Sequence, residues 1–378
     1  MYGGGSERQI LSLLRHLDRD RFNPYLYLAN WTGPLLEEIP EDVPTASFDR
    51  RWRGPLAPRL LMHRRRVRDM SQYLREVNAH VCYDRTFLMT LIAADAGQRT
   101  GVPNISTIVT DPALGFYPVA GRFGWIKRRI LRRLYSRSTF VLANSDGAAR
   151  SAESFYGLSP GSVQTLYNGI DVESVLQQSR LPLDDPWWTE EATKPIFRIA
   201  TAGRLNHEKG FHLLIDAVAT LHEQNTAEFR VAILGEGGAR KTLQSQIDRA
   251  GLTSQIRLTG FRSDAVGWYR HADLFVLPSL LEGMPNVLLE AMACGTPVLS
   301  SDCPSGPREI LDNESFGFLC RPGSADSLAS KLREIIDSPE QVQSKANKAI
   351  GRVSECFSAA GATRQLEEFL LKASKRTQ

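Results

Sequence analysis

The sequence lacks any uninterrupted apolar run of 18 or more residues, the length that a membrane-spanning helix requires. Its amino-terminal residues contain no apolar stretch of the kind that directs export, so no secretion signal is expected. The five cysteines are scattered without a C-x-x-C pair, which argues against a disulfide framework or a zinc site. These absences predict a protein that works in the reducing cytosol.

The overall composition is typical of a globular protein, since 42% of the 378 residues are hydrophobic and 23% are charged. A chain of this length favours two domains over one. Residues 1–180 hold 24 Lys and Arg against 17 Asp and Glu, whereas residues 181–378 hold 22 against 25. We therefore expect the first half to face an anionic partner. No nucleic-acid-binding motif accompanies this charge, so a membrane surface or a lipid phosphate ranks above nucleic acid.

One stretch, residues 278–298, combines the features of a nucleotide-sugar site. An apolar run before it predicts a short buried strand, a turn follows at Glu282, and a helix is expected from Pro285 to Gly295. Glu290 lies inside that helix. Backbone amides at a helix start bind phosphate oxygens, and carboxylates accept hydrogen bonds from sugar hydroxyls. An ordinary strand–helix unit with two unrelated glutamates is the plainer interpretation.

A second stretch follows the strand predicted at 197–202. Gly203 and Gly210 bound a loop that carries Arg204 and Lys209. Two cations at the carboxyl end of a strand suit a diphosphate, because Arg can hold two phosphate oxygens at once and open α/β sheets bind ligands at that edge. A loop with two solvated basic residues is the alternative.

Together the two stretches resemble motifs of the retaining glycosyltransferases of family 4. Glu282 and Glu290, followed by residues 291–298 (AMACGTPV), are similar to the paired glutamates of that family. Residues 203–210 (GRLNHEKG) are similar to its G-R-L-x-x-x-K-G motif. Residues 305–310 (SGPREI) resemble a turn in members that build polysaccharides or lipid-linked oligosaccharides. The resemblance implies the GT-B fold, in which two Rossmann-like domains face a cleft.

Alternating predicted strands and helices in both halves also favour an α/β protein with two Rossmann-like domains. The expected divisions are an acceptor-binding domain at 1–175, a polar linker at 176–195, a nucleotide-sugar domain at 196–355 and a helix at 356–378 that packs back on the first domain. Members of the family begin with a strand before the glycine-rich loop at 3–5, so the first strand of the N-terminal domain is expected to be missing here. Ser6 is expected to cap the next helix, with Gln9 at the capping-box position.

The resemblance also implies a role for each candidate residue. Glu282 is expected at the hydroxyls of the transferred sugar and Glu290 at the ribose. Arg204 and Lys209 are expected to neutralise the departing nucleoside diphosphate, so the catalytic candidates are Glu282, Arg204 and Lys209. The further donor-binding candidates are Gly203, Gly283, Met284, Asn286, Val287, Phe261, Arg262, Gly4 and Gly5. The family needs neither a metal nor a cofactor besides the donor, so none is expected.

Two departures from the family pattern bear on activity. Residues 282–285 read E-G-M-P where many members read E-G-F-G, and Thr110 or Asp111 stands where many carry a histidine. The expected function is retaining transfer of a hexosyl or N-acetylhexosaminyl group from a nucleotide-sugar, by family usage a UDP-sugar. The expected acceptor is a glycan or a polyprenyl-diphosphate-linked molecule in cell-surface polysaccharide or glycoconjugate synthesis. The alternatives are a catalytically inactive nucleotide-sugar-binding or assembly protein and a nucleotide-sugar epimerase or hydrolase.

Residues 122–137 (RFGWIKRRILRRLYSR) combine apolar residues at helical spacing with a cluster of basic ones. A basic helix with an apolar stripe suits the surface of an anionic bilayer. The stripe could equally pack on the sheet while the arginines extend into water. Because many relatives glycosylate lipid acceptors, the resemblance favours a cytoplasmic protein with peripheral contact at the inner face of the membrane.

Overall fold

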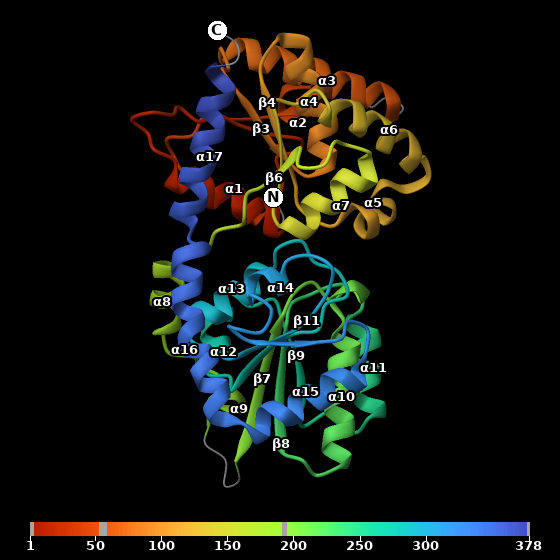
Figure 1. Ribbon diagram of the computed structural model, residues 1–378, viewed down its shortest axis with the longest axis vertical. Coiled ribbons are helices and arrows are strands. Elements are labelled where there is room, and N and C mark those ends of the chain that lie inside the picture. The colour runs from red at the N-terminus through yellow and green to blue at the C-terminus, as the bar shows by residue number, and fades with distance from the viewer. Residues whose placement is uncertain (1–3, 53–58, 191–194, 376–378) are drawn as a thin grey trace. The chain divides into compact units, whose positions relative to one another are not determined.

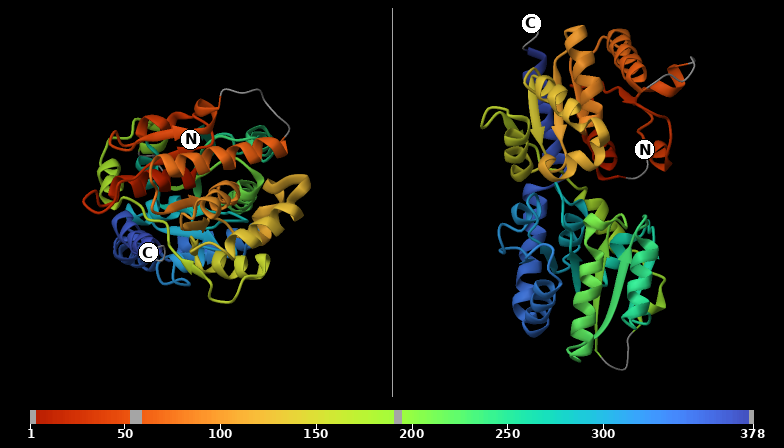
Figure 2. Two further views of the ribbon diagram at one scale, coloured as in Figure 1. Left: turned by 90° about the horizontal axis from the view of Figure 1, so that it is seen from above. Right: turned by 90° about the vertical axis from the view of Figure 1, so that its right-hand side faces the viewer.

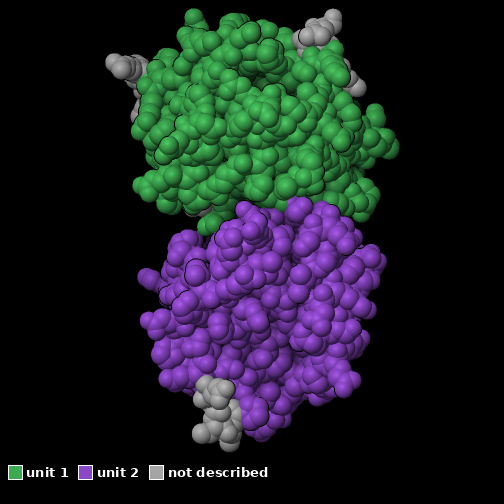
Figure 3. All heavy atoms as spheres, turned by 90° about the vertical axis from the view of Figure 1, so that its left-hand side faces the viewer, with its two compact units in different colours: residues 1–169, 359–378 green, residues 170–358 purple. Residues whose placement is uncertain are grey.

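The computed structural model describes residues 4–52, 59–190 and 195–375 (Figure 1). The chain forms two compact units, Met1–Gly169 with Ala359–Gln378 and Ile170–Ser358 (Figure 3). The units therefore divide at different residues from the predicted domains. Parts of the predicted first domain, linker and final helix, at 1–3, 53–58, 191–194 and 376–378, lie outside the described residues.

The first unit is built on a four-stranded parallel sheet with the order β3-β4-β5-β6. These strands are β3 (Cys82–Arg85), β4 (Asn104–Ile108), β5 (Phe140–Ala143) and β6 (Val163–Thr165). A second, two-stranded parallel sheet pairs β1 (Leu26–Leu28) with β2 (Thr45–Ser47). The helices are α1 (Gly5–His16), α2 (Phe48–Arg51), α3 (Arg59–Glu76), α4 (Phe87–Thr100), α5 (Pro112–Ala120), α6 (Gly124–Tyr135), α7 (Asp146–Tyr156) and α17 (Ala359–Ser374), with 3-10 turns η1 (Pro34–Glu38) and η2 (Gly121–Phe123).

Side chains that alternate along the central strands place apolar groups on both faces of this sheet. Ile105 and Leu142 pack with Leu13 of α1 and with Phe369 of α17. On the opposite face, Ile108 belongs to a cluster with residues of α4, α5, α6 and α7. The carboxyl-terminal helix α17 thus belongs to the first unit and packs against α1.

The start of α1 differs from the prediction for Ser6. The helix begins at Gly5 with Gly4 as its N-cap, and the Gly4 N–H donates to Glu7 Oε2 at 2.7 Å. The side chain of Gln9 donates instead to the Gly169 carbonyl at 2.8 Å and is buried. The predicted cap at Ser6 is therefore wrong, because the helix begins at Gly5 and Glu7, not Gln9, completes the capping box.

The second unit contains a six-stranded parallel sheet with the order β12-β11-β10-β7-β8-β9 and helices on both of its faces (Figure 2). Its strands are β7 (Ile196–Ala202), β8 (Glu228–Leu234), β9 (Ile256–Gly260), β10 (Leu274–Leu277), β11 (Val298–Ser301) and β12 (Phe318–Cys320). Its helices are α8 (Val172–Ser179), α9 (Pro186–Thr189), α10 (Phe211–Glu223), α11 (Arg240–Arg249), α12 (Ala265–Arg270), α13 (Asn286–Ala293), α14 (Pro307–Ile310), α15 (Ala325–Asp337) and α16 (Pro339–Cys356), with the 3-10 turn η3 (His207–Lys209). The chain moves outward from β7 through β8 to β9, and then restarts on the other side of β7 with β10. The order of the strands therefore reverses between β7 and β10.

The segment predicted as a polar linker is packed into the second unit where the structure describes it. α8 contacts α12 and α13. Trp188 of α9 is fully buried, donates its indole N–H to the Trp268 carbonyl at 3.2 Å and lies with its ring 5.3 Å from the Trp268 ring. The aromatic area that Trp188 buries explains why this segment joins the unit despite its prolines and polar residues.

Most of the predicted basic helix at 122–137 lies in η2 and α6, and its apolar side chains divide into a buried set and an exposed set. Leu131 and Leu134 are buried against the sheet, as the packing interpretation requires. Phe123 and Trp125, in contrast, are 59% and 65% exposed. Among the described residues, no helix has the length and apolar character needed to cross a bilayer.

Candidate functional site

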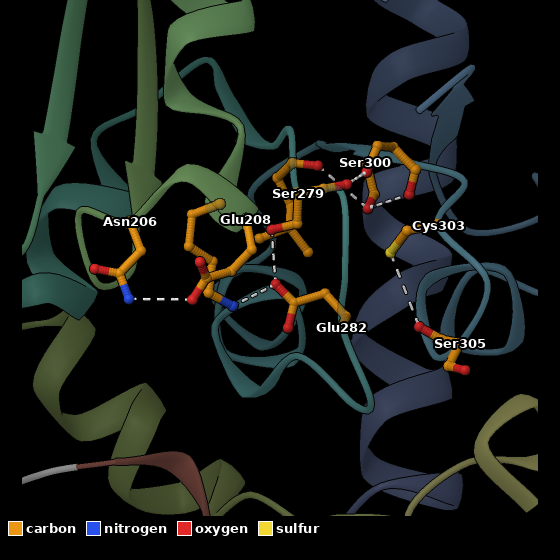
Figure 4. A network of polar contacts seen from close by, with 10 residues as sticks. Asn206, Glu208, Ser279, Glu282, Ser300, Cys303 and Ser305 are labelled. Atoms are coloured by element: carbon orange, nitrogen blue, oxygen red, sulfur yellow. Dashed lines mark hydrogen bonds and ion pairs between the residues drawn. The ribbon is translucent and has the colours of Figure 1, made fainter. Parts of the chain in front are cut away.

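The two predicted motifs of the second unit meet at the carboxyl edge of its sheet. The loop with Arg204 and Lys209 follows β7, and the turn at Glu282 follows β10. Figure 4 shows Asn206 and Glu208 of the first loop close to Ser279 and Glu282. β7 and β10 pair directly, so both loops leave the sheet at neighbouring positions. Because the strand order reverses between these two strands, this edge is where an open α/β sheet has its ligand-binding crevice.

A direct ion pair joins the two loops. The Lys209 Nζ lies 2.6 Å from Glu282 Oε1, and the hydroxyl of Ser279 donates to the same oxygen at 2.7 Å. The side chains of Lys209 and Glu282 are 21% and 9% exposed, so water screens their attraction only in part. Sequence reasoning missed Ser279, although its place at a strand end, three residues before Glu282, was a usable signal.

Two backbone contacts hold the same loops together. The Leu280 N–H donates to the Glu208 carbonyl at 2.8 Å. Gly210 has a φ of 67°, and a Cβ added there would lie 1.9 Å from the Pro278 carbonyl oxygen. Only glycine combines this left-handed conformation with so close an approach of another chain segment.

Glu208 was not predicted as a site residue, yet its side chain belongs to the same loop. Asn206 Nδ2 donates to Glu208 Oε1 at 3.1 Å. Burial acts to raise the pKa of Glu208, but the hydrogen bond from Asn206 and the nearby Lys209 and Arg204 hold that pKa below its ordinary value. Glu208 is therefore a carboxylate at neutral pH and balances part of the positive charge of the loop.

The loop after β11 supports the acidic turn from its other side. The hydroxyl of Ser301 donates to the Ser279 carbonyl. Gly306 has a φ of 93°, and a Cβ there would lie 2.5 Å from the Gly283 carbonyl oxygen. Burial, reinforced by the charge of Glu282, raises the pKa of Cys303 to about 12, so this thiol stays protonated.

The remaining donor-binding candidates of the second unit lie around this cluster. Gly203 follows β7 directly and donates its N–H to the Leu234 carbonyl at 3.0 Å. Arg204 is exposed. The other candidates near the acidic turn are the buried Gly283 and Met284, Asn286 and Val287 in the first turn of α13, and the half-buried Glu290 in its second turn.

Two groups of predicted residues lie outside the contacts that join Lys209 to Glu282. Phe261, 68% exposed, and Arg262 follow β9, and Arg262 forms an ion pair with Asp264 at 2.6 Å. Gly4 and Gly5 belong to the first unit, where they start α1. In the chain as far as it is described, no three His, Cys, Asp or Glu side chains are grouped to hold a metal ion.

Asp111, one of the two residues that stand in the place of the family's histidine, has a structural role in the first unit. It is the N-cap of α5, accepts from the Ala113 N–H at 2.9 Å and also accepts from the Ser151 hydroxyl. The Asp111 side chain is buried, and both contacts use its Oδ1. Asp111 is thus a helix cap in this structure.

The sheet order and the edge site define a GT-B α/β protein. The structure of Anabaena HepE in complex with UDP-glucose matches 98% of this chain and 97% of that chain, with a TM-score of 0.79 at 22% identity. Sucrose-phosphate synthase from Thermosynechococcus elongatus matches 98% of this chain and 93% of that chain, with a TM-score of 0.77 at 19% identity.

Sequence comparison gives the family. The model described as Glycosyltransferase Family 4 matches residues 3–174, and the model described as Glycosyl transferases group 1 matches residues 189–352. The chain belongs to this glycosyltransferase family. A curated relative, the N-acetylgalactosamine-N,N'-diacetylbacillosaminyl-diphospho-undecaprenol 4-alpha-N-acetylgalactosaminyltransferase of Campylobacter jejuni, is 26% identical over 371 residues, which cover 97% of this chain and 96% of the relative.

Proposed function

We propose that this chain is a retaining glycosyltransferase that moves a hexosyl or N-acetylhexosaminyl group from a UDP-sugar to a glycan or a polyprenyl-diphosphate-linked acceptor. The observation that carries the proposal is the contact between Lys209 and Glu282, which joins the two motif loops at the crevice of the sheet. The name of the Campylobacter relative specifies a diphospho-undecaprenol acceptor, and the HepE structures contain UDP and UDP-glucose. These relatives support the choice of donor and acceptor, and a role in cell-surface polysaccharide or glycoconjugate synthesis.

The geometry of Glu282 suits a group that holds a sugar. Its contacts with Lys209 and Ser279 both use Oε1, and Oε2 makes no hydrogen bond in the part of the chain that the structure describes. Because Oε1 fixes the carboxylate in place, Oε2 can accept a hydrogen bond from a sugar hydroxyl without moving. Glu282 therefore orients the transferred sugar.

The cations of the β7 loop suit the departing diphosphate. Bond cleavage leaves negative charge on the diphosphate while the anomeric carbon becomes cationic, and fixed positive groups stabilise that charge. Arg204 and Lys209 supply these groups, and Glu290 on α13 holds the ribose. In this proposal the two side chains perform the charge neutralisation that a metal performs elsewhere, and neither a metal nor a further cofactor takes part.

Substitution of the two cations tests the assignment. Arg204→Ala and Lys209→Ala are each expected to abolish transfer, whereas Lys241→Ala and Arg249→Ala, which remove exposed cations of α11 in the same unit, leave it unchanged. Circular dichroism checks the fold, and release of UDP from a panel of UDP-sugars with membrane extract as acceptor measures turnover. NMR of the product reads whether the anomeric configuration is retained.

Each other outcome of this assay identifies a different function. Near-normal turnover by either cation variant contradicts the roles given to Arg204 and Lys209. UDP binding without turnover favours an inactive binding or assembly protein. Donor hydrolysis without an acceptor, or inversion at C2 of the sugar, favours a hydrolase or an epimerase.

We also propose that residues 122–137 make peripheral contact with an anionic membrane at its cytoplasmic face. Phe123 and Trp125 are more than half exposed, and Ile126 and Ile130 are 37% and 41% exposed. Exposed arginines of η2 and α6 flank them, which is the pattern of a helix that lies in a lipid interface. The five cysteines are all free, which supports a reducing compartment.

Vesicle flotation tests this contact. Trp125→Ser combined with Ile130→Ser is expected to release the protein from phosphatidylglycerol vesicles, because the lost apolar area no longer enters the interface. Leu181→Ser is the matched control, since Leu181 is 62% exposed on the second unit. Equal flotation of the double variant and the control contradicts the membrane contact.

A further inference from the structure

The first unit contains a basic groove that none of the roles above uses. The groove, about 800 Å³ in volume, lies on α3 and α4, which pack against each other, and is lined by Arg64, Arg68, Ser71, Gln72, Arg75 and Arg99. We call it the α3–α4 groove (both helices are labelled in Figure 1). Four of its six lining side chains are arginines and none is acidic.

The arginines of this region divide into two sets with different surroundings. Arg51 pairs with Asp69 at 3.0 Å and with Glu76 at 2.9 Å. Arg65 lies over the Trp52 ring at 4.6 Å and Arg66 over the Phe48 ring at 5.5 Å. These arginines hold α2 and α3 together. Arg51 forms ion pairs with both acidic side chains of α3, Asp69 and Glu76.

The groove arginines have no such partners on α3. Arg64, Arg68 and Arg75 are exposed, and within the described residues they form no ion pair. They lie at positions that share one face of an α-helix. Arg99 faces them from α4 and is paired with Asp95 at 3.1 Å. The groove therefore carries a surplus of positive charge that the folded chain does not neutralise.

The arrangement of these arginines favours a phosphate ligand. The guanidinium fork matches two oxygens of a phosphate, and Arg is favoured where such oxygens are held in pairs. Arg64 and Arg75 are separated by about 16 Å along the helix axis, which exceeds a single phosphate. The long arginine side chains can converge on a ligand with two linked phosphates, or each can contact one of several neighbouring lipid headgroups.

We propose that the α3–α4 groove is a second anion-binding site, separate from the donor site, that takes paired phosphate groups. The shared chemistry is a diphosphate or two adjacent phosphodiesters, supplied either by a soluble molecule or by the headgroups of a lipid surface. The groove lies wholly in the first unit, so its ligand does not depend on the roles given to Arg204 and Lys209.

Calorimetric titration with inorganic pyrophosphate tests the site. The full-length protein carries Arg204→Ala and Lys209→Ala, so that the proposed donor site does not contribute to the signal. Adding Arg64→Gln, Arg68→Gln and Arg75→Gln is expected to weaken pyrophosphate binding at least about tenfold, because a hydrogen bond to a charged group is worth roughly a factor of ten or more.

The matched control removes the same charge elsewhere on the first unit. Arg150→Gln, Arg364→Gln and Lys372→Gln replace three exposed cations on α7 and α17, and the affinity is expected to stay within about twofold, because exposed charges at a distance are screened by salt. Equal loss in the two triple variants, or no loss in the groove variant, overturns the proposal. If the donor-site assignment fails, the two triple variants can still be compared, because both also carry Arg204→Ala and Lys209→Ala.

A second measurement does not depend on how the variants fold. In the wild-type protein, pyrophosphate is expected to protect the groove arginines from phenylglyoxal, read by mass spectrometry, while Arg150 and Arg364 react as before. Equal reactivity of the groove arginines with and without pyrophosphate counts against the site.

Flotation on phosphatidylglycerol and phosphatidylcholine vesicles then distinguishes the two sources of phosphate. If the groove triple loses binding to phosphatidylglycerol while Trp125 and Ile130 are intact, the ligand is a lipid headgroup. If the groove triple variant still binds vesicles but no longer binds pyrophosphate, the ligand is a soluble diphosphate. Both results support a phosphate site.

Discussion

Replacing Gly210 by alanine tests whether the contact between the β7 and β10 loops holds the site together. The added Cβ would lie 1.9 Å from the Pro278 carbonyl oxygen, at a residue whose φ is 67°. Alanine in the left-handed region costs about 1–2 kcal/mol, and the steric overlap adds about 1–3 kcal/mol. We expect Gly210→Ala to lower the free energy of unfolding by about 2–5 kcal/mol in total.

Gly251→Ala separates the cost of the left-handed conformation from the cost of the steric overlap. Gly251 has a φ of 68°, but a Cβ there meets no atom within 4 Å. It therefore carries the conformational cost of about 1–2 kcal/mol without the overlap. Urea denaturation of both variants measures the difference, which is the cost of pushing Pro278 away from Gly210.

We also expect the two variants to differ in activity. In Gly210→Ala one loop must move, so Lys209 and Glu282 no longer meet at 2.6 Å. A displacement of about 1 Å in a catalytic group can lower turnover by roughly a hundredfold. Gly251→Ala is expected to turn over sugar normally at a temperature where it is folded. If both variants lose the same stability and both keep full activity, the contact between Gly210 and Pro278 does not position the site.

Three other substitutions give independent checks. Ser279→Ala removes a donor to Glu282 at 2.7 Å, and kcat/KM is expected to fall about ten- to hundredfold in steady-state assays, because a hydrogen bond to a charge is worth about 1.5–3 kcal/mol. Burial raises the pKa of Asp84 from 3.8 to about 6, so in the pH window between these two values the folded state keeps a proton that the unfolded state has released. Stability therefore rises as pH falls through that window, and urea titrations should show this slope disappear in Asp84→Asn. Gly351→Ala, at an exposed position inside α16 with open space around it, is expected to add about 0.5–1 kcal/mol of stability, and a lower Tm would contradict this.

The elements that build the site could be predicted from the sequence because their signals are local. The apolar runs gave β7 and β10 nearly at their observed bounds, and the proline and glycine around the expected helix bracket α13. The predicted residues Lys209 and Glu282 lie in contact, which follows from two parallel strands that present their carboxyl ends at one edge.

The contacts that fix this site could not be predicted in the same way. The position of Ser279 at a strand end was a usable signal, but its hydrogen bond to Glu282 depends on how the turn folds. The contact of the Glu208 carbonyl with Leu280 follows only once β10 is known to lie beside β7. Gln9 and Trp188 show the same limit, since each is determined by a partner far away in the sequence. Local capping and linker patterns at these two positions are overridden by burial.

The contacts between the β7 and β10 loops also restrict how this enzyme can be altered. Glu208, Lys209 and Gly210 are consecutive, and each meets a different residue of the segment 278–282. Inserting or deleting one residue in either loop would shift all three contacts at once. Under the proposed function, changes of donor preference are expected from exchanging side chains at constant loop length, so a library that varies residue identity at 283–287 is a better starting point than one that varies loop length.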